Sequence, residues 1–329
     1  MSGPIWAVVE LDPDRLPTRL SLEAATAART LAAAAGTSSA AIIAASDPGT
    51  AAAALAAFVA RVVVVRLPAE VAGSNVAAAG AIATAAAEDP VVILVGATPE
   101  GRETAGILAA RLGLGVLGNA TGLAWSEGED GAPAGPRVEM SVLGGRALTT
   151  SAFADGRGII TVRPGAVTAE PADVAGTVEE VSIPTLPATG VRTVGRADAA
   201  TRRASIEEAS IVVTGGRGLG GPGGVALLEE LAGALGGAVA ATRAAVDAGW
   251  LPFAIQVGQT GRTIRPSVYV GVGVSGAIQH RVGMQDAETI VAINRDPDAP
   301  IAEHADLYVV GDLFEIVPAV VAALRARAT

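Results

Sequence analysis

The chain has 329 residues, enough for two domains with separate hydrophobic cores. It contains no cysteine and only two histidines, which excludes a disulfide framework, a thiol nucleophile, an iron–sulfur cluster and a histidine-rich metal site. The net charge of −10 argues against nucleic acid as a partner, because affinity for nucleic acid comes largely from neutralising its phosphates.

No stretch of the sequence predicts insertion into a membrane. The longest uncharged run, residues 71–87, is interrupted by Gly, Ser, Asn and Thr and is too short to span a bilayer. No basic region precedes the first expected strand, so a signal peptide is not indicated. We therefore expect a cytoplasmic protein.

The first part of the chain predicts repeated strand–helix units. The expected strands are residues 5–9, 40–44, 62–65 and 91–95, and the expected helices are 20–34 with Ser21 as N-cap, 48–58, 74–86, and one between Thr98 as N-cap and Gly113 as C-cap. The apolar runs are continuous rather than alternating, which indicates a parallel sheet covered on both faces. The turn at 96–98 could hold a ligand, although an ordinary strand-to-helix connection is the simpler interpretation.

A different pattern follows this helix. The acidic stretch 126–135 predicts the connection of a hairpin. Residues 137–142, 146–151 and 159–162 are expected to form antiparallel strands that close the domain. From 169 to about 205 the periodicity lapses, and we interpret this stretch as a connection that runs partly extended along another surface.

The second part of the chain alternates short apolar runs with loops rich in Gly, Ser, Thr and Gln. Strands are expected at 211–213, 238–241, 268–272, 289–293 and 305–310, with helices at 225–235 and 313–325. In an open α/β sheet such loops gather at the carboxyl ends of the strands, where ligands bind. The sequence thus predicts an α/β protein of two domains, residues 1–190 and 206–329, joined by a linker at 191–205.

The glycine loop at 214–224 is compatible with a bound phosphate. Backbone amides and the dipole of the following helix favour an anion there. The string GRGLGG matches G-x-G-x-x-G, but seven glycines in ten residues satisfy many patterns. The acidic residue expected after the second strand is replaced by Thr242-Arg243, which weakens the case for a nicotinamide-dependent dehydrogenase. Arg217 is placed to meet a phosphate or carboxylate, whereas Arg243 fits a surface position equally well, and His280 could be a structural histidine.

Six motifs connect this half of the chain with a known family. They are GGRG, RAAVDAG, QVGQTG, GVSGAIQH, VAINRDPDAPI and ADLYVVGDLFEIVP, and ITVRPGAV extends the likeness into the first domain. In this order and spacing they closely resemble the α subunits of electron transfer flavoproteins. The resemblance implies that the second domain has a Rossmann-like fold of the deoxyhypusine-synthase type and binds FAD. It also implies that the first domain contacts a β subunit in a heterodimer, and that AMP belongs mainly to that partner.

The family's FAD contacts transfer onto named positions of this sequence. They are Arg217, Thr242, Arg243, Val257, Gly258, Gln259, Thr260, Ser275, Gly276, Ala277, Ile278, Gln279, His280, Asn294, Asp312 and Leu313. The resemblance places His280 at flavin O2, Arg243 against the ring system, and Gln259 with Thr260 near N5 and O4. Thr242 stands where many relatives have serine, Arg262 replaces a lysine, and 138–150 lacks the aromatic residues expected there.

The resulting hypothesis is an electron carrier without its own organic substrate. It would accept electrons from dehydrogenases, such as acyl-CoA dehydrogenases of fatty acid β-oxidation, and pass them to a quinone oxidoreductase. Three alternatives remain open. The first is an electron-bifurcating relative, the second a flavin- or nicotinamide-dependent oxidoreductase with its own small substrate, and the third a nucleotide-binding regulatory module without redox function.

Overall fold

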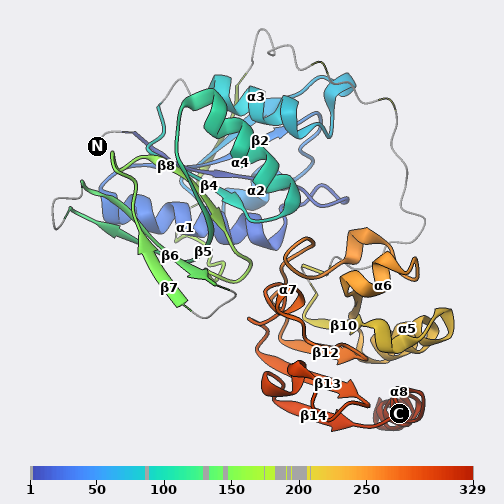
Figure 1. Cartoon of the computed structure of the whole chain (residues 1–329). Coiled ribbons are helices and arrows are strands. Elements are labelled where there is room, and N and C mark those ends of the chain that lie inside the picture. The colour runs from blue at the N-terminus through green and yellow to red at the C-terminus, as the bar shows by residue number, and fades with distance from the viewer. Residues whose placement is uncertain are drawn as a thin grey trace. The chain divides into compact units, whose positions relative to one another are not determined.

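The computed structural model describes residues 3–85, 89–128, 133–143, 147–173, 175–181, 190, 194, 206–207 and 209–328. The chain divides into two compact units, Met1–Asp198 and Ala199–Thr329 (Figure 1). Apart from Val194, the linker expected at 191–205 lies outside the described residues.

The first unit contains a nine-stranded sheet in the order β7-β6-β5-β8-β4-β1-β2-β3-β9. Its strands are β1 Ile5–Val8, β2 Ser39–Ala45, β3 Arg61–Arg66, β4 Val92–Gly96, β5 Val116–Ser126, β6 Gly135–Val142, β7 Ala147–Ser151, β8 Gly158–Val162 and β9 Thr177–Val181. The helices are α1 Arg19–Ala35, α2 Ala51–Leu55, α3 Asn75–Ala85 and α4 Pro99–Leu112. Among the described strands of this sheet, β5–β6 and β6–β7 are the antiparallel pairs.

Alternate residues of the central strands enter two separate cores. Ile5 and Ala7 of β1 pack with α1 and α2 on one face, whereas Trp6 and Val8 pack with α3 and α4 on the other (Figure 1). Both faces of these strands are therefore buried, which is why their sequences read as continuous apolar runs. Alanine dominates the buried positions of α1, so this helix can lie close to the sheet.

The structure corrects several expected boundaries near the start of the chain. Thr18, not Ser21, is the N-cap of α1, and its hydroxyl accepts a hydrogen bond from the Ser21 N–H at 3.2 Å. The Ser21 hydroxyl is engaged elsewhere, because it bonds to the backbone N–H and carbonyl of Glu10. The helix expected at 48–58 is limited to α2, since Gly49 has a φ of 53° and cannot lie within a right-handed helix.

The antiparallel closing strands were only partly predicted. The hairpin around 126–135 and the pairing of β6 with β7 are confirmed. The strand at 159–162 is wrong in orientation, because β8 lies in the sheet interior, parallel to both β4 and β5. Strand β5 was missed. It is half exposed and bulged, and it contains glycines and an asparagine at φ 58° rather than a run of β-branched residues.

The second unit is a five-stranded, all-parallel sheet in the order β11-β10-β12-β13-β14. Its strands are β10 Ile211–Gly215, β11 Ala238–Ala241, β12 Val268–Val272, β13 Thr289–Asn294 and β14 Leu307–Val310. The helices are α5 Pro222–Leu235, α6 Arg243–Asp247, α7 Ile278–Arg281 and α8 Leu313–Ala328. Helix α5 begins three residues earlier than expected, because Pro222 is accommodated in the first turn. The strand order reverses between β10 and β12, which is the position where open sheets of this kind hold ligands.

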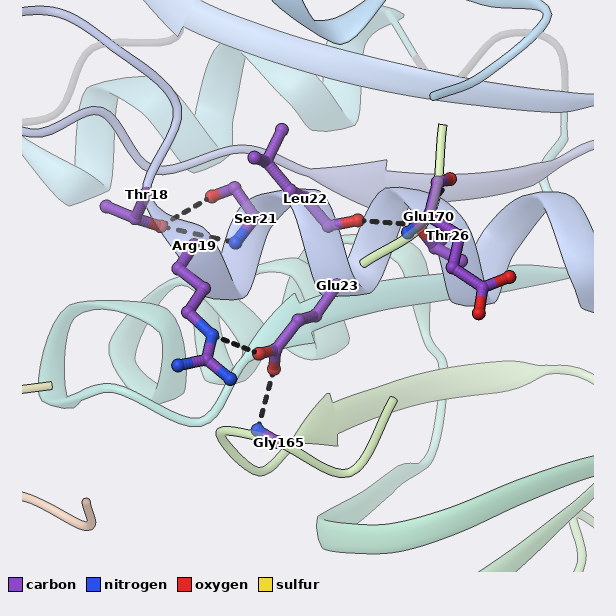
Figure 2. Close-up of polar contacts among 8 residues, drawn as sticks. All are labelled: Thr18, Arg19, Ser21, Leu22, Glu23, Thr26, Gly165 and Glu170. Atoms are coloured by element: carbon purple, nitrogen blue, oxygen red, sulfur yellow. Dashed lines mark hydrogen bonds and ion pairs between the residues drawn. The ribbon is translucent and has the colours of Figure 1, made fainter. Parts of the chain in front are cut away.

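In the first unit, residues 163–173 follow β8 and form a strap that is hydrogen-bonded to α1. Figure 2 shows the contacts of this strap with α1. The buried Glu23 carboxylate accepts a hydrogen bond from the Gly165 N–H at 2.7 Å and forms an ion pair with Arg19 at 3.0 Å. One turn later, the Thr26 hydroxyl accepts from the Glu170 N–H at 3.1 Å. The sequence analysis assigned residues 169–205 to a connection and did not predict the strand β9 within it, which pairs parallel with β3.

We predict that Glu23→Ala loosens this strap. The substitution removes the buried carboxylate that accepts the part-buried hydrogen bond of the Gly165 N–H, which should lower the free energy of unfolding by about 2–3 kcal/mol. Arg19→Ala removes only the exposed partner of the same carboxylate and should cost less than about 1 kcal/mol. Urea denaturation measures both values, and hydrogen exchange of peptides covering 163–170 localises the effect. Equal losses in the two variants would contradict the role given to Glu23.

Candidate functional site

The loops at the carboxyl edge of the second sheet continue its backbone hydrogen bonding. Beyond β10 the Gly216 N–H donates to Val272 O at 3.0 Å and the Gly218 N–H to Gly273 O at 3.0 Å. Beyond β11 the Thr242 N–H donates to Gly215 O at 2.9 Å. The loops after three neighbouring strands are therefore held together as one surface at the point where the strand order reverses.

Glycine is required where these loops touch. A Cβ at Gly216 would lie 2.2 Å from Gly273 O, and a Cβ at Gly218 would lie 2.6 Å from Gly273 Cα. Gly273 itself has a φ of 61°, which few other residues adopt. The glycines of the 214–224 loop that meet Gly273 thus serve close contact between two loops. By contrast, a Cβ at Gly220 or Gly223 would meet no atom within 4 Å, and only Gly220 of these two has a positive φ.

Thr242 carries a buried hydroxyl without a partner. The residue is 8% exposed, and its Oγ1 makes no hydrogen bond with any part of the chain that the structure describes. It occupies the N-cap position of α6 in extended conformation, yet its side chain does not cap the helix. A buried hydroxyl without a hydrogen bond lowers the stability of the fold unless a ligand forms a hydrogen bond with it.

Two exposed arginines follow the same strands: Arg217 lies in the loop after β10, and Arg243 directly follows Thr242. Arg217 lies in the short 3-10 turn Arg217–Leu219 after β10, and it forms no ion pair with the described residues. Arg243 begins α6 and pairs with Asp247 at 3.3 Å, with side chains 69% and 64% exposed. The carboxyl edge therefore presents positive charge beside the unpaired threonine hydroxyl.

The turn at 256–262 is closed by its own hydrogen bonds. The Arg262 N–H donates to Gln256 O at 2.7 Å, and the Gly258 N–H donates to Arg262 O at 3.1 Å. The Gln256 side chain donates to the Thr260 hydroxyl at 3.0 Å, while Val257 is buried and Gln259 and Thr260 are exposed. Arg262, expected to keep the charge of a lysine, pairs with Glu207 at 2.7 Å and bonds to Ala254 O at 2.8 Å.

The loop that follows β12 leads into α7. Gly276 has a φ of 80°, and a Cβ there would lie 2.4 Å from Ile301 N, so this position admits little but glycine. Ser275, Ala277, Ile278 and Gln279 are exposed, and the Ser275 carbonyl accepts from the Ile301 N–H at 3.1 Å.

His280 turns away from this exposed surface. Its Nδ1 lies 2.9 Å from Val257 O and its Nε2 lies 2.7 Å from the hydroxyl of Tyr269. Burial lowers the pKa of His280 to about 4, against the opposing effect of the hydrogen bond to Val257 O. The imidazole is therefore neutral at neutral pH, and both of its nitrogens are engaged within the protein.

The last two strands end in residues that shape their own loops. The Asn294 side chain donates to Val274 O at 2.9 Å, which ties the end of β13 to the loop after β12. Asp312 Oδ1 accepts from the Phe314 N–H at 2.8 Å at the start of α8, and Leu313 is buried at 7% exposure.

The chain matches two protein-family models and several curated proteins. Residues 5–186 match the model of the electron transfer flavoprotein domain, and residues 205–285 match that of the electron transfer flavoprotein FAD-binding domain. The chain is 43% identical over 246 residues to an electron transfer flavoprotein subunit alpha of Mycobacterium leprae, covering 74% of each chain. Subunits of the same name from Mycobacterium tuberculosis and Thermoanaerobacterium thermosaccharolyticum are 44% and 42% identical over 240 residues, which is 72% of this chain in both cases and 72% and 71% of theirs.

The chain belongs to the electron transfer flavoprotein α-subunit family. The resemblance inferred from the six motifs is thereby confirmed, as is the α/β fold with one mostly parallel and one parallel sheet. The match to the FAD-binding domain, 205–285, includes the loops after β10, β11 and β12, whereas Asn294, Asp312 and Leu313 lie beyond it.

The residues of these loops fit the flavin nucleotide of this electron transfer flavoprotein family. Thr242 offers an unpaired buried hydroxyl, and Arg217 and Arg243 offer exposed positive charge for phosphate or for an electron-rich ring. The sequence analysis did not single out Tyr269, whose hydroxyl bonds to His280, or Glu207, which pairs with Arg262. In both cases the partner is distant in the sequence, so no local pattern points to the contact.

Two other kinds of site find no support in the described residues. No group of three or more His, Asp or Glu side chains is arranged to hold a metal ion there, and none of the described helices is long and apolar enough to cross a bilayer. At 96–98 in the first unit, the Thr98 hydroxyl accepts from the Gly101 N–H at 2.8 Å and donates to Glu10 Oε1 at 2.7 Å. Thr98 is thus the N-cap of α4, as expected for an ordinary strand-to-helix turn.

We predict that Gly216→Ala destabilises the second unit. Its new methyl group would collide with Gly273 O, and separating the two loops should cost about 1–3 kcal/mol. Gly223→Ala adds the same methyl group in open space within the first turn of α5 and should be neutral or stabilise by up to about 1 kcal/mol. Urea denaturation followed through the fluorescence of Trp250 compares the two. A Gly216→Ala chain as stable as Gly223→Ala would show that the loops do not need this contact.

Proposed function

We propose that this chain binds FAD with the loops at the carboxyl edge of its second sheet and carries electrons as part of a heterodimer with a β subunit. The match of 205–285 to an FAD-binding domain carries the proposal, and the unpaired Thr242 hydroxyl supports it from the structure. The proposed contacts are Arg217, Thr242, Arg243, residues 257–260 and 275–280, Asn294, Asp312 and Leu313.

FAD and the protein would have different roles at this site. FAD, when bound, supplies the one- and two-electron chemistry. The chain supplies no nucleophile or general base at this edge; it binds and orients the cofactor and sets the electrostatic potential around it. Thr242 and Arg217 suit the phosphates, whereas Arg243 suits the place where negative charge arrives on reduction.

The proposed carrier needs a β subunit, an electron donor and an electron acceptor. Relatives of this chain are named as subunits, which favours a β subunit as the permanent partner. We propose that AMP is bound mainly by that partner, that dehydrogenases such as acyl-CoA dehydrogenases donate the electrons, and that a quinone oxidoreductase accepts them. Reduction of the purified pair by candidate dehydrogenases, compared with direct reduction by NADH or small substrates, separates this carrier from an oxidoreductase with its own substrate.

The first test is cofactor content. The α/β pair, purified from co-expression, should show the visible absorption of a flavin and release FAD on denaturation. Thr242→Val removes the unpaired hydroxyl at nearly constant volume, so it should leave the flavin-free chain as stable as before or more stable. The same change should raise the Kd for FAD about tenfold or more, because a hydrogen bond to a charged group is lost.

A matched variant shows whether this response is specific. Thr98→Val removes a hydroxyl that caps α4, so it should lower stability by about 1 kcal/mol without altering the Kd for FAD. A colourless pair that stays colourless after incubation with FAD would refute the proposed function. An unchanged Kd in Thr242→Val would remove this residue from the site.

The second test concerns charge. Arg243 is exposed and paired with Asp247, so water and the carboxylate both weaken its field, and a contribution on the order of 1 kcal/mol is expected. Since about 1.4 kcal/mol corresponds to roughly 59 mV for one electron, Arg243→Ala should lower the first reduction potential by a few tens of millivolts. Thr260→Ala, which removes a neutral hydroxyl, should lower it less.

The counter-charge provides the control for this prediction. Asp247→Asn leaves Arg243 in place and removes the neighbouring negative charge, so it should shift the potential in the opposite direction. Spectroelectrochemical titration of the three variants in the α/β pair measures these shifts. Identical potentials in Arg243→Ala and the unaltered pair would exclude Arg243 from this role.

A further inference from the structure

The Arg262 side chain makes two bonds just beyond the 257–260 turn. Its Nε donates to Ala254 O at 2.8 Å, and its Nη1 donates to Glu207 Oε2 at 2.7 Å. Glu207 lies 55 residues away in the sequence, shortly before β10. The side chains of Arg262 and Glu207 are only 25% and 17% exposed, so water screens this ion pair less than the exposed pair of Arg243 with Asp247.

The backbone of Arg262 closes the turn itself. Its N–H donates to Gln256 O at 2.7 Å, and its carbonyl accepts from the Gly258 N–H at 3.1 Å. Between these two residues, the Val257 N–H donates to Ala241 O at 2.9 Å, which attaches the turn to the last residue of β11. A displacement of Arg262 would therefore reach the turn from both sides of Val257.

The positive charge of Arg262 is matched within the protein by the Glu207 carboxylate. A guanidinium holds its donors in one plane, so Nε and Nη1 can serve two acceptors at once, whereas a lysine ammonium is a point charge on a flexible stem. Ala254 O and Glu207 are two such acceptors, on segments that are far apart in the sequence. These bonds suit a residue that holds segments in place better than one that offers its charge to a ligand.

We propose that Arg262 is a positioning residue of the flavin site, and that its ion pair with Glu207 holds the 257–260 turn in the shape that receives FAD. The inference rests on the proposed function, because this turn is one of the proposed contacts. Arg262 and Glu207 are not themselves among those contacts, so they act through the turn. From the sequence, Arg262 was expected only to retain the charge of a lysine.

Removal of the carboxylate separates this positioning role from a direct electrostatic one. Glu207→Ala leaves Arg262 with its charge and takes away its partner. A direct effect of the arginine charge would make this variant bind the anionic FAD more tightly, because an opposing negative charge is gone. A positioning role predicts the opposite sign: the Kd of the α/β pair for FAD should rise about three- to tenfold.

Two variants serve as references for Glu207→Ala. Glu230→Ala removes the same charge from another ion pair of the unit, the 3.0 Å contact of Glu230 on α5 with Arg325 on α8, and should alter the Kd by less than about twofold. Glu207→Gln keeps a neutral acceptor for Arg262, so it should weaken FAD binding less than Glu207→Ala. It also provides the comparison of sign should Glu207→Ala not fold.

Substitutions of the arginine complete the cycle. Arg262→Met keeps an apolar stem without donors and should raise the Kd for FAD about tenfold, whereas Arg262→Lys keeps the ion pair and should raise it by only about twofold. The double variant of Glu207→Ala with Arg262→Met should bind FAD no more weakly than Arg262→Met alone, because the two residues act as one unit.

Hydrogen exchange of the flavin-free full chain gives a readout that needs no cofactor. The Gly258 and Arg262 amides are bonded within the turn, so a peptide covering 256–262 should exchange faster in Glu207→Ala. The same peptide should exchange at the unaltered rate in Glu230→Ala.

Three outcomes would overturn the proposal. They are tighter or unchanged binding of FAD in Glu207→Ala, additive effects of Glu207→Ala and Arg262→Met on the Kd, and unaltered exchange of the 256–262 peptide in Glu207→Ala. Absence of FAD from the unaltered pair is a different failure. It would refute the proposed function, while the exchange measurement would still decide whether the ion pair holds the turn.

Discussion

The second unit depends on the close contact between the loops that follow β10 and β12. Gly216 and Gly218 meet Gly273 with no room for side chains, and backbone hydrogen bonds extend the sheet beyond its last residues. Because the two loops diverge from adjacent strands at the reversal of strand order, this contact decides whether the edge closes into one surface or splits into separate loops. The position of Thr242 follows from it, since the Thr242 N–H bonds to Gly215 O directly beneath the contact.

Above this contact, neutral and charged groups are separated by depth. His280 and Tyr269 form a buried, uncharged pair, whereas Arg217 and Arg243 are exposed. A cation in the place of the imidazole would be costly because burial disfavours charge, while an exposed guanidinium costs little but is screened by water. The buried pair therefore holds the loops in place, whereas the exposed arginines set the electrostatic potential at the surface. Substitutions can alter these two properties independently.

Local sequence predicted the elements whose signals are local. Continuous apolar runs marked the buried parallel strands, and Thr98 and Gly113 marked the ends of α4 correctly. Strand β5 was not predicted because its half-exposed residues lack a β-branched run. The direction of β8 was predicted wrongly because the choice of neighbouring strand depends on the whole sheet. The same limit applies to the site. Its glycine loops are visible in the sequence, but the bond between Tyr269 and His280 arises only when β12 and α7 are packed together.

Two threonines show what distinguishes a ligand edge from an ordinary one in this chain. Thr98 and Thr242 each follow a parallel strand and occupy the N-cap position of a helix. The Thr98 hydroxyl is satisfied twice, by the Gly101 N–H and by the carboxylate of Glu10, so the first unit supplies its own anion beside the start of α4. The Thr242 hydroxyl is equally buried but meets no such group among the described residues. Since buried hydroxyls are rarely left unpaired, the difference supports a scaffold role for the first edge and a ligand role for the second.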